Sequence, residues 1–88
     1  MPLIASFQGI NIYMYTEVDT PHHLPHFHAY YAEFIASFSV SPPVVLEGAL
    51  PRRQTRFVLA WAELRQSELE ENWRRVQNGE KPIKIAGL

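Results

Sequence analysis

The first half of the chain places apolar residues at every second position, which is the period of half-buried β-strands. In residues 10–15 the apolar side chains alternate with Asn and Tyr, and in residues 34–40 they alternate with Ser37 and Ser39. Glycine at Gln8-Gly9 and the break at Ala32-Glu33 suit tight turns. The pattern predicts strands over residues 3–7, 10–15, 26–31 and 34–40, and a short fifth strand at 44–46.

The second half has the longer period of helices, but its apolar stripe changes face. Phe57, Trp61 and Leu64 lie on one face of a helix. Another face, rotated by roughly 120°, carries Leu69, Trp73 and Val76. Between them, Ser67 and Glu70 have the spacing of a capping box. We therefore predict two helices, about 51–65 and 68–78, with a bend at Gln66-Ser67. Their large apolar side chains, including Leu64, are expected in the core or an interface.

Strands followed by helices are typical of the α+β class. We expect a small antiparallel sheet of four to five strands within residues 3–46, covered on one face by the two C-terminal helices. Residues 1–88 are expected to form a single domain. The tail after residue 80 is predicted to be short and extended, either docked on the sheet or frayed.

Composition limits the chemistry available to the chain. With 47% apolar and 19% charged residues, it has the balance of an ordinary globular protein. The absence of cysteine excludes disulfides and thiolate zinc sites, and a net charge of -1 gives no general attraction to nucleic acid or membranes. The sequence has neither a signal peptide nor an apolar run of membrane-spanning length, so we expect a cytoplasmic protein.

All four histidines fall within seven residues, at His22, His23, His26 and His28. On a strand over residues 26–31, His26, His28 and Tyr30 would share one face. Such a pair could transfer protons as catalytic residues. It could instead hold zinc, nickel or copper with His22 or His23 as a third ligand, or act structurally through hydrogen bonds to the proline-rich loop.

A second candidate lies at the expected start of the first helix. Gly48 permits a tight turn, and Arg52, Arg53 and Arg56 then crowd the first helical turns. Free backbone N–H groups together with arginines can bind an anion such as phosphate, with Glu47 as a candidate catalytic base beside them. Alternatively, the arginines are solvated and pair with nearby glutamates.

Three segments carry a resemblance to a known family: PHFH at 25–28, LEGALP at 46–51 and ENW at 71–73. Together with the opening and the helical half, they resemble the bacterial family known as domain of unknown function 4160. The resemblance implies a small α+β domain whose gene often lies beside that of a small protein of the family known as domain of unknown function 2442. Such pairs have been proposed as toxin–antitoxin modules, and the family offers no established catalytic residues.

Three functional hypotheses follow, and a fourth, a nucleic-acid-binding regulator with RNA as a possible partner, is weakened by the near-zero net charge. The first is an interaction component of a toxin–antitoxin-like module, which would offer a partner a sheet edge at residues 34–40 or at the tail. The second is a metal-independent RNA-cleaving toxin in which His26 and His28 act with Arg52 and Arg53. It requires the histidine strand to lie within hydrogen-bonding reach of residues 46–53. The third is a metal-binding protein that holds zinc or nickel at the histidine cluster.

Overall fold

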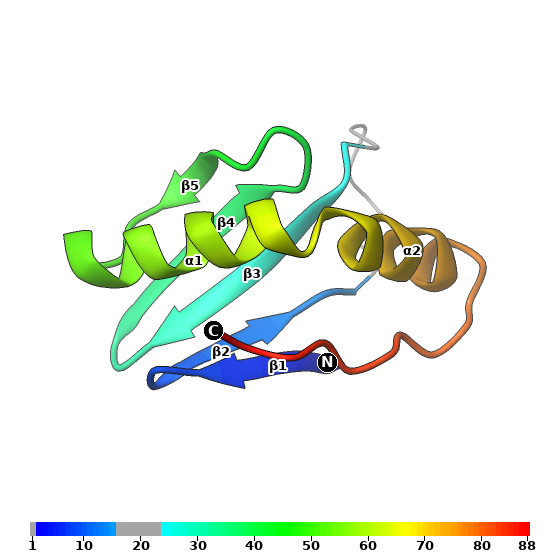
Figure 1. Cartoon of the computed structure of the whole chain (residues 1–88), viewed down its shortest axis with the longest axis horizontal. Helices are drawn as coiled ribbons and strands as arrows, with labels where there is room; N and C mark the ends of the chain where they lie inside the picture. Colours follow the sequence, from blue (N-terminus) through cyan, green and yellow to red (C-terminus); the bar gives the residue numbers. More distant parts are fainter. Residues whose placement is uncertain (1, 16–23) are drawn as a thin grey trace.

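The computed structural model describes residues 2–15 and 24–88, in which five strands precede two helices (Figure 1). The predicted α+β class and element order are confirmed. The elements are β1 (Leu3–Phe7), β2 (Ile10–Tyr13), β3 (His26–Tyr31), β4 (Phe34–Ser39), β5 (Val45–Gly48), α1 (Arg52–Leu64) and α2 (Gln66–Gln77).

The strands form one antiparallel sheet in the order β1-β2-β3-β4-β5, so each strand pairs with its neighbours in the sequence. The predicted turn at Gln8-Gly9 joins β1 to β2, and both of its residues have positive φ angles, 51° and 75°. In this order β4 is an inner strand, paired on both sides. The expectation that residues 34–40 offer a free edge is therefore wrong, and β5 lies at the end of the sheet instead.

Both helices lie on the same side of the sheet, and α1 crosses in front of it in Figure 1. The core between the layers is built around Trp61, whose ring lies 5.2 Å from that of Phe7 and 5.7 Å from that of Phe27. No element of residues 2–15 and 24–88 covers the opposite side of the sheet. We call that side the open face; it carries Asn11, Tyr13, His26, His28, Tyr30, Ile35, Ser37 and Glu47.

The break between the helices comes at Arg65, one residue before the predicted bend. Arg65 has a φ of -114°, and α2 begins at Gln66 without any side-chain cap. The predicted capping box is therefore wrong, because Ser67 lies inside the first turn of α2 instead of preceding it. The side chain of Gln66 donates hydrogen bonds to the carbonyl oxygens of Val40 and Ala62, which fastens the helix junction to the sheet.

One expected core residue lies outside the core. Leu64 is 71% exposed, because α1 packs through Val58, Trp61 and Ala62. At 100° per residue, Leu64 is rotated by about 110° from the middle of that stripe. Leu69 and Val76 of α2 are buried, as predicted.

The C-terminal tail docks against the sheet and the helices. The backbone N–H of Ile85 donates to the carbonyl oxygen of Ile4 in β1, at 2.7 Å, and the indole N–H of Trp61 donates to Ala86, at 2.8 Å. Asn72, which is 1% exposed, makes two hydrogen bonds to the backbone of Ile83. The tail therefore lies beside β1 and contributes to the fold.

No helix in the described parts of the chain combines the length and the hydrophobicity that crossing a bilayer requires.

Candidate functional site

Strand β3 carries the two histidines that the structure describes. Phe27 and Ala29 point into the core, so His26, His28 and Tyr30 point to the open face. The ring centroids of His26 and His28 are 5.4 Å apart, edge to face. The prediction that these two histidines face the same way is confirmed.

His28 belongs to an aromatic cluster on the open face. The ring of Tyr15 stacks on it at 4.8 Å with an interplanar angle of 12°. Tyr13 lies directly opposite His28 on β2, and its ring contacts that of Tyr30 edge to face at 5.1 Å. All four side chains are half-buried, so the cluster presents ring surface to the solvent while it packs against itself.

His26 links this cluster to helix α2. Its Nδ1 lies 2.9 Å from the carbonyl oxygen of Leu24, and its ring centroid lies 5.2 Å from that of Trp73. Two of the segments that carry the family resemblance, 25–28 and 71–73, therefore meet at this contact. The helical period placed Trp73 in the core or an interface, and Trp73 does pack against the core, but the period gave no sign of a histidine partner on β3.

The structure describes only part of the predicted metal site. Within residues 2–15 and 24–88, no group of three or more His, Asp or Glu side chains is arranged to hold a metal ion. His22 and His23, the expected sources of a third ligand, lie outside the described residues. Zinc or nickel binding at the histidine cluster therefore stays a prediction.

Glu47 lies on the same face as His28 but not beside it. Ser37 of β4 is the register partner of His28 on one side and of Glu47 on the other. Two strand spacings, about 10 Å in all, thus separate the backbones of His28 and Glu47. The three residues form a polar row across the sheet, in which Ser37 is the direct neighbour of both.

The arginines lie apart from this row. Helix α1 carries three exposed arginines, Arg52, Arg53 and Arg56. It packs on one side of the sheet, and the histidines point to the opposite side. The guanidinium of Arg53 lies over the ring of Phe57, 5.5 Å from its centroid. The structure does not bring the histidines and the arginines together, so the geometric requirement of the RNA-cleaving scheme is not met in the described residues.

Exposed apolar side chains gather at the other end of the sheet, where sequence reasoning predicted only a short strand. All four residues of β5 are exposed. Val44, Val45 and Leu46 are 41–46% exposed, and Ile35 in the neighbouring strand is 51% exposed. We call these four residues the β5 edge patch. No signal in the sequence separates them from the buried Val and Ile residues, because their exposure depends on where the helices lie.

Gly48 explains why β5 can approach β4 closely. Its φ is +74°, and a Cβ at this position would lie 2.3 Å from the carbonyl oxygen of Ile35. The next residue, Ala49, donates its N–H to that same oxygen. Glycine in the LEG segment therefore has a structural cause in the packing of the edge strand.

Comparison with known proteins gives one match. The model of a family described as domain of unknown function (DUF4160) matches residues 9–74, which include the aromatic cluster, the β5 edge patch and the first nine residues of α2. Neither the curated proteins nor the solved structures gave a match to this chain.

Proposed function

The chain belongs to the DUF4160 family, and we propose that it is the interaction component of a two-protein, toxin–antitoxin-like module. In this proposal it holds a small partner protein along strand β5. The observation that carries the proposal is the β5 edge patch, in which three large apolar side chains in or beside the end strand β5, and Ile35 of the neighbouring strand β4, are exposed.

Apolar side chains grouped in this way favour association. Burying each of them against a partner removes apolar surface from water, worth roughly 25 cal/mol for each Å². Exposed clusters of apolar side chains add no stability to a monomer, and they often mark protein–protein interfaces. The apolar residues also lie on both sides of the edge, because Val45 is opposite the core residue Phe38 while Ile35 is on the open face.

The backbone of β5 adds a second means of contact. Among the described strands only β4 pairs with it, so its outer side can accept a strand of another chain. The strand is short and its register with β4 shifts between Ser37 and Phe38, which limits how many main-chain hydrogen bonds it can form. We therefore expect the apolar side chains to supply most of the affinity and the strand edge to set the orientation.

The family resemblance indicates the partner's class. A small protein of the family domain of unknown function 2442, from the same genome, is the natural candidate. The RNA-cleaving alternative is less well supported, because its histidines and arginines lie on different layers of the fold.

The test is co-expression of the chain with that small protein, followed by purification through a tag on the small protein and by calorimetry. We expect a stable complex with the unchanged chain and a loss of affinity of about tenfold or more with Leu46→Lys. Leu64→Lys is the matched control, since it places the same charge at an exposed leucine on α1. Absence of a complex, or equal effects of the two variants, would refute binding at β5.

A growth assay tests the toxin–antitoxin part separately. We expect growth arrest when one of the two proteins is induced alone, and relief when both are induced. If neither protein arrests growth, the module is not toxin–antitoxin-like, although binding at β5 could still be measured by calorimetry.

A further inference from the structure

We propose that the open face binds single-stranded nucleic acid, at a surface that adjoins the β5 edge patch at Ile35. The inference rests on three features of the described residues: half-buried aromatic rings that keep some surface accessible, neutral polar neighbours, and lysines along one edge. Single-stranded nucleic acids are bound by sheets that offer flat rings to the bases and positive charge to the backbone.

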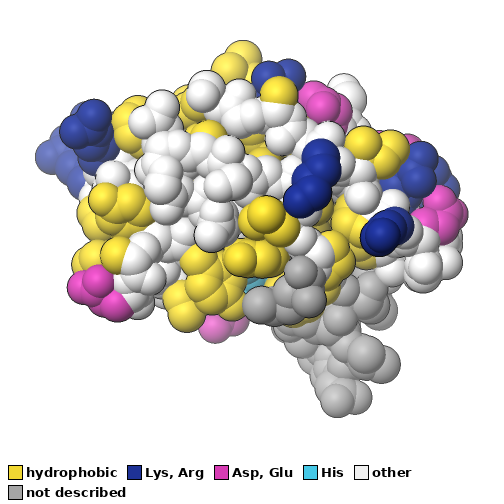
Figure 2. All heavy atoms as spheres, turned by 90° about the horizontal axis from the view of Figure 1, so that it is seen from below, with side chains coloured by type: hydrophobic (Ala, Val, Ile, Leu, Met, Phe, Trp, Pro, Cys, Tyr) yellow, Lys and Arg dark blue, Asp and Glu magenta, His cyan; other side chains and the backbone are white. Residues whose placement is uncertain are grey.

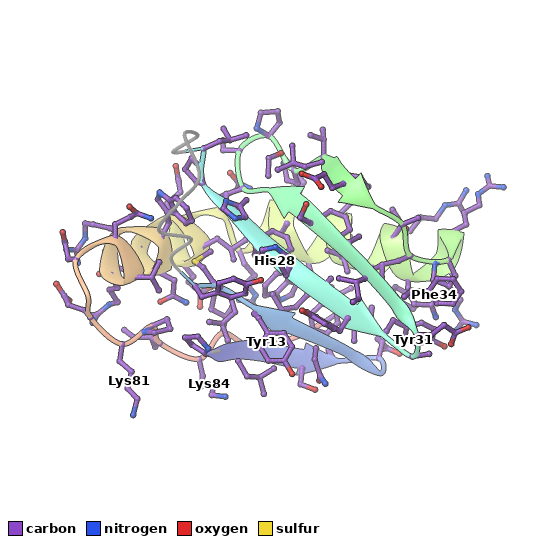
Figure 3. The ribbon with its side chains drawn as sticks, turned by 180° about the vertical axis from the view of Figure 1, so that it is seen from behind. Tyr13, His28, Tyr31, Phe34, Lys81 and Lys84 are labelled. Carbon is purple, nitrogen blue, oxygen red and sulfur yellow. The ribbon has the colours of Figure 1, made fainter. Side chains whose placement is uncertain are left out.

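The rings lie on the two middle strands and on the segment after β2. Tyr13 and Tyr30 form one contacting pair, and Tyr15 and His28 form the other. Tyr13 and His28 project from neighbouring strands toward the viewer in Figure 3. Because these rings are half-exposed and adjacent, successive bases could stack over them without any rearrangement of the sheet.

The residues between and beside the rings are polar but mostly uncharged. Asn11 and Ser37 are the strand neighbours of Tyr30 and His28, and Ser6 donates its hydroxyl to the amide oxygen of Asn11 at 2.8 Å. Such groups can hydrogen-bond base edges and sugar hydroxyls. Glu47, at the far end of the face, is the single carboxylate in the five described strands, so the face carries little charge that would repel phosphates.

The positive charge lies at the opposite edge, beside β1. Lys81 and Tyr15 line a common hollow of about 350 Å³. Lys84 precedes Ile85, whose N–H bonds to β1, so its exposed side chain also lies at this edge. Figure 3 shows both lysines extending from the lower border of the molecule, with Lys84 nearer to Tyr13 and Lys81 farther along that border. Figure 2 shows basic side chains among hydrophobic ones on the molecule's underside.

The acidic residues near the lysines are already paired with arginines. Glu80 lines the same hollow as Lys81, but its carboxylate lies 3.5 Å from the guanidinium of Arg75 and 4.0 Å from that of Arg74. Glu68 and Glu71 line a second hollow with Lys84, and they form ion pairs with Arg65 and with Arg74 and Arg75. The lysines are thus the groups at this edge that can meet phosphates. A strand of nucleic acid would run its backbone along the lysines and turn its bases inward over Tyr13 and Tyr30.

The experiment is fluorescence anisotropy on the full chain, with fluorescein-labelled ten-nucleotide RNA and DNA single strands of mixed sequence. We expect binding with a shallow salt dependence, a slope of about −1.4 in a double-logarithmic plot for two phosphate contacts. We expect Tyr13→Val to weaken binding about tenfold and Tyr13→Phe to leave it nearly unchanged, since phenylalanine keeps the stacking ring. Circular dichroism checks that both variants fold.

Two double variants, each of which removes two positive charges, test where the phosphates of the nucleic acid bind. Lys81→Gln with Lys84→Gln should weaken binding severalfold, whereas Arg52→Gln with Arg53→Gln, which removes the same charge from α1, should not. Binding of RNA alone, or of RNA and DNA equally, supports the proposal and identifies the sugar preference. No binding at about 1 mM protein, equal effects of the lysine and arginine variants, or full binding by Tyr13→Val would each overturn it. Capture of a protein segment in place of either strand would overturn it as well.

Discussion

Asn72 is the residue whose replacement tests most directly how the tail is held. It lies on α2, is 1% exposed, and uses both ends of its amide on one backbone position. Its Nδ2 donates to the carbonyl oxygen of Ile83 at 2.7 Å, and its Oδ1 accepts from the N–H of Ile83 at 2.8 Å. The substitution Asn72→Ala removes both hydrogen bonds and leaves the rest of α2 in place.

The expected cost follows from these contacts. Each hydrogen bond contributes about 0.5–1.5 kcal/mol net, so the pair contributes about 1–3 kcal/mol. Because Ile83 is 53% exposed, water can reach its backbone after the substitution, and the full desolvation penalty does not apply. We therefore expect a loss of about 2 kcal/mol, against a total of roughly 4–13 kcal/mol for a domain of this size.

Urea denaturation followed by tryptophan fluorescence measures this loss, since Trp61 is itself bonded to the tail. With a denaturant dependence of about 1 kcal/mol per molar urea, the midpoint should fall by roughly 2 M. Gln77→Ala, an exposed change on the same helix, should shift the midpoint little. Hydrogen exchange should also show faster exchange of the Ile83 and Ile85 amides. A shift as small as that of Gln77→Ala would mean that Asn72 does not hold the tail.

Two further predictions concern the backbone and the surface charges. Gly48→Ala should lower the free energy of unfolding by about 2 kcal/mol or more, because the φ of Gly48 is +74° and the new Cβ would lie 2.3 Å from a carbonyl oxygen. Gly79→Ala is the control, since Gly79 also has a positive φ but has open space around it. In thermal melts, Gly79→Ala should lower the stability less than Gly48→Ala does. The hydrogen bond from Arg74 lowers the pKa of Glu71 from its ordinary value of 4.5, so this carboxylate stabilises the fold above pH 4.5 and the benefit disappears as the pH falls through the lowered pKa. Comparison of Glu71→Gln with the unchanged chain should therefore show a small difference in melting temperature at pH 7 that vanishes in acid, and a difference that grows in acid would refute this assignment.

The features that depend on strand period were predictable from the sequence. His26 and His28 share a face because successive side chains of a strand alternate, whatever the rest of the fold does. The same alternation turns Phe27 to the opposite face, which in the structure is the core side, where Phe27 stacks on Phe38. The residues at the helix ends were a less reliable guide. Helix α2 ends at Gln77, close to the predicted end at about residue 78, but the capping signal at Ser67 is not used. The junction between the helices is held instead by a hydrogen bond from the side chain of Gln66 to the carbonyl oxygen of Val40, the residue after β4. No pattern among neighbouring residues of the sequence indicates this contact.

The candidate site depended on contacts between distant segments, which local patterns do not encode. The contact between His26 and Trp73 joins β3 to α2, and the separation of the histidines from Arg52 and Arg53 follows from the side of the sheet on which α1 packs. From the sequence alone, either side was allowed.

The side of the sheet on which the helices pack also determines which surfaces remain uncovered for function. Once both helices cover one face of a five-stranded meander, the opposite face and the last strand are left uncovered by the described residues. Apart from Ile35, which belongs to both surfaces, the open face is aromatic and polar, whereas the β5 edge patch is aliphatic, so the two suit different partners. Binding at one need not block the other, because Tyr13 and Leu46 lie on strands separated by β3 and β4. A protein that binds a small partner at β5 and a nucleic acid strand on the open face would couple the two ligands through the sheet and through Ile35, which belongs to both surfaces. The row from Tyr13 through His28 and Ser37 to Glu47 is the direct line across that sheet.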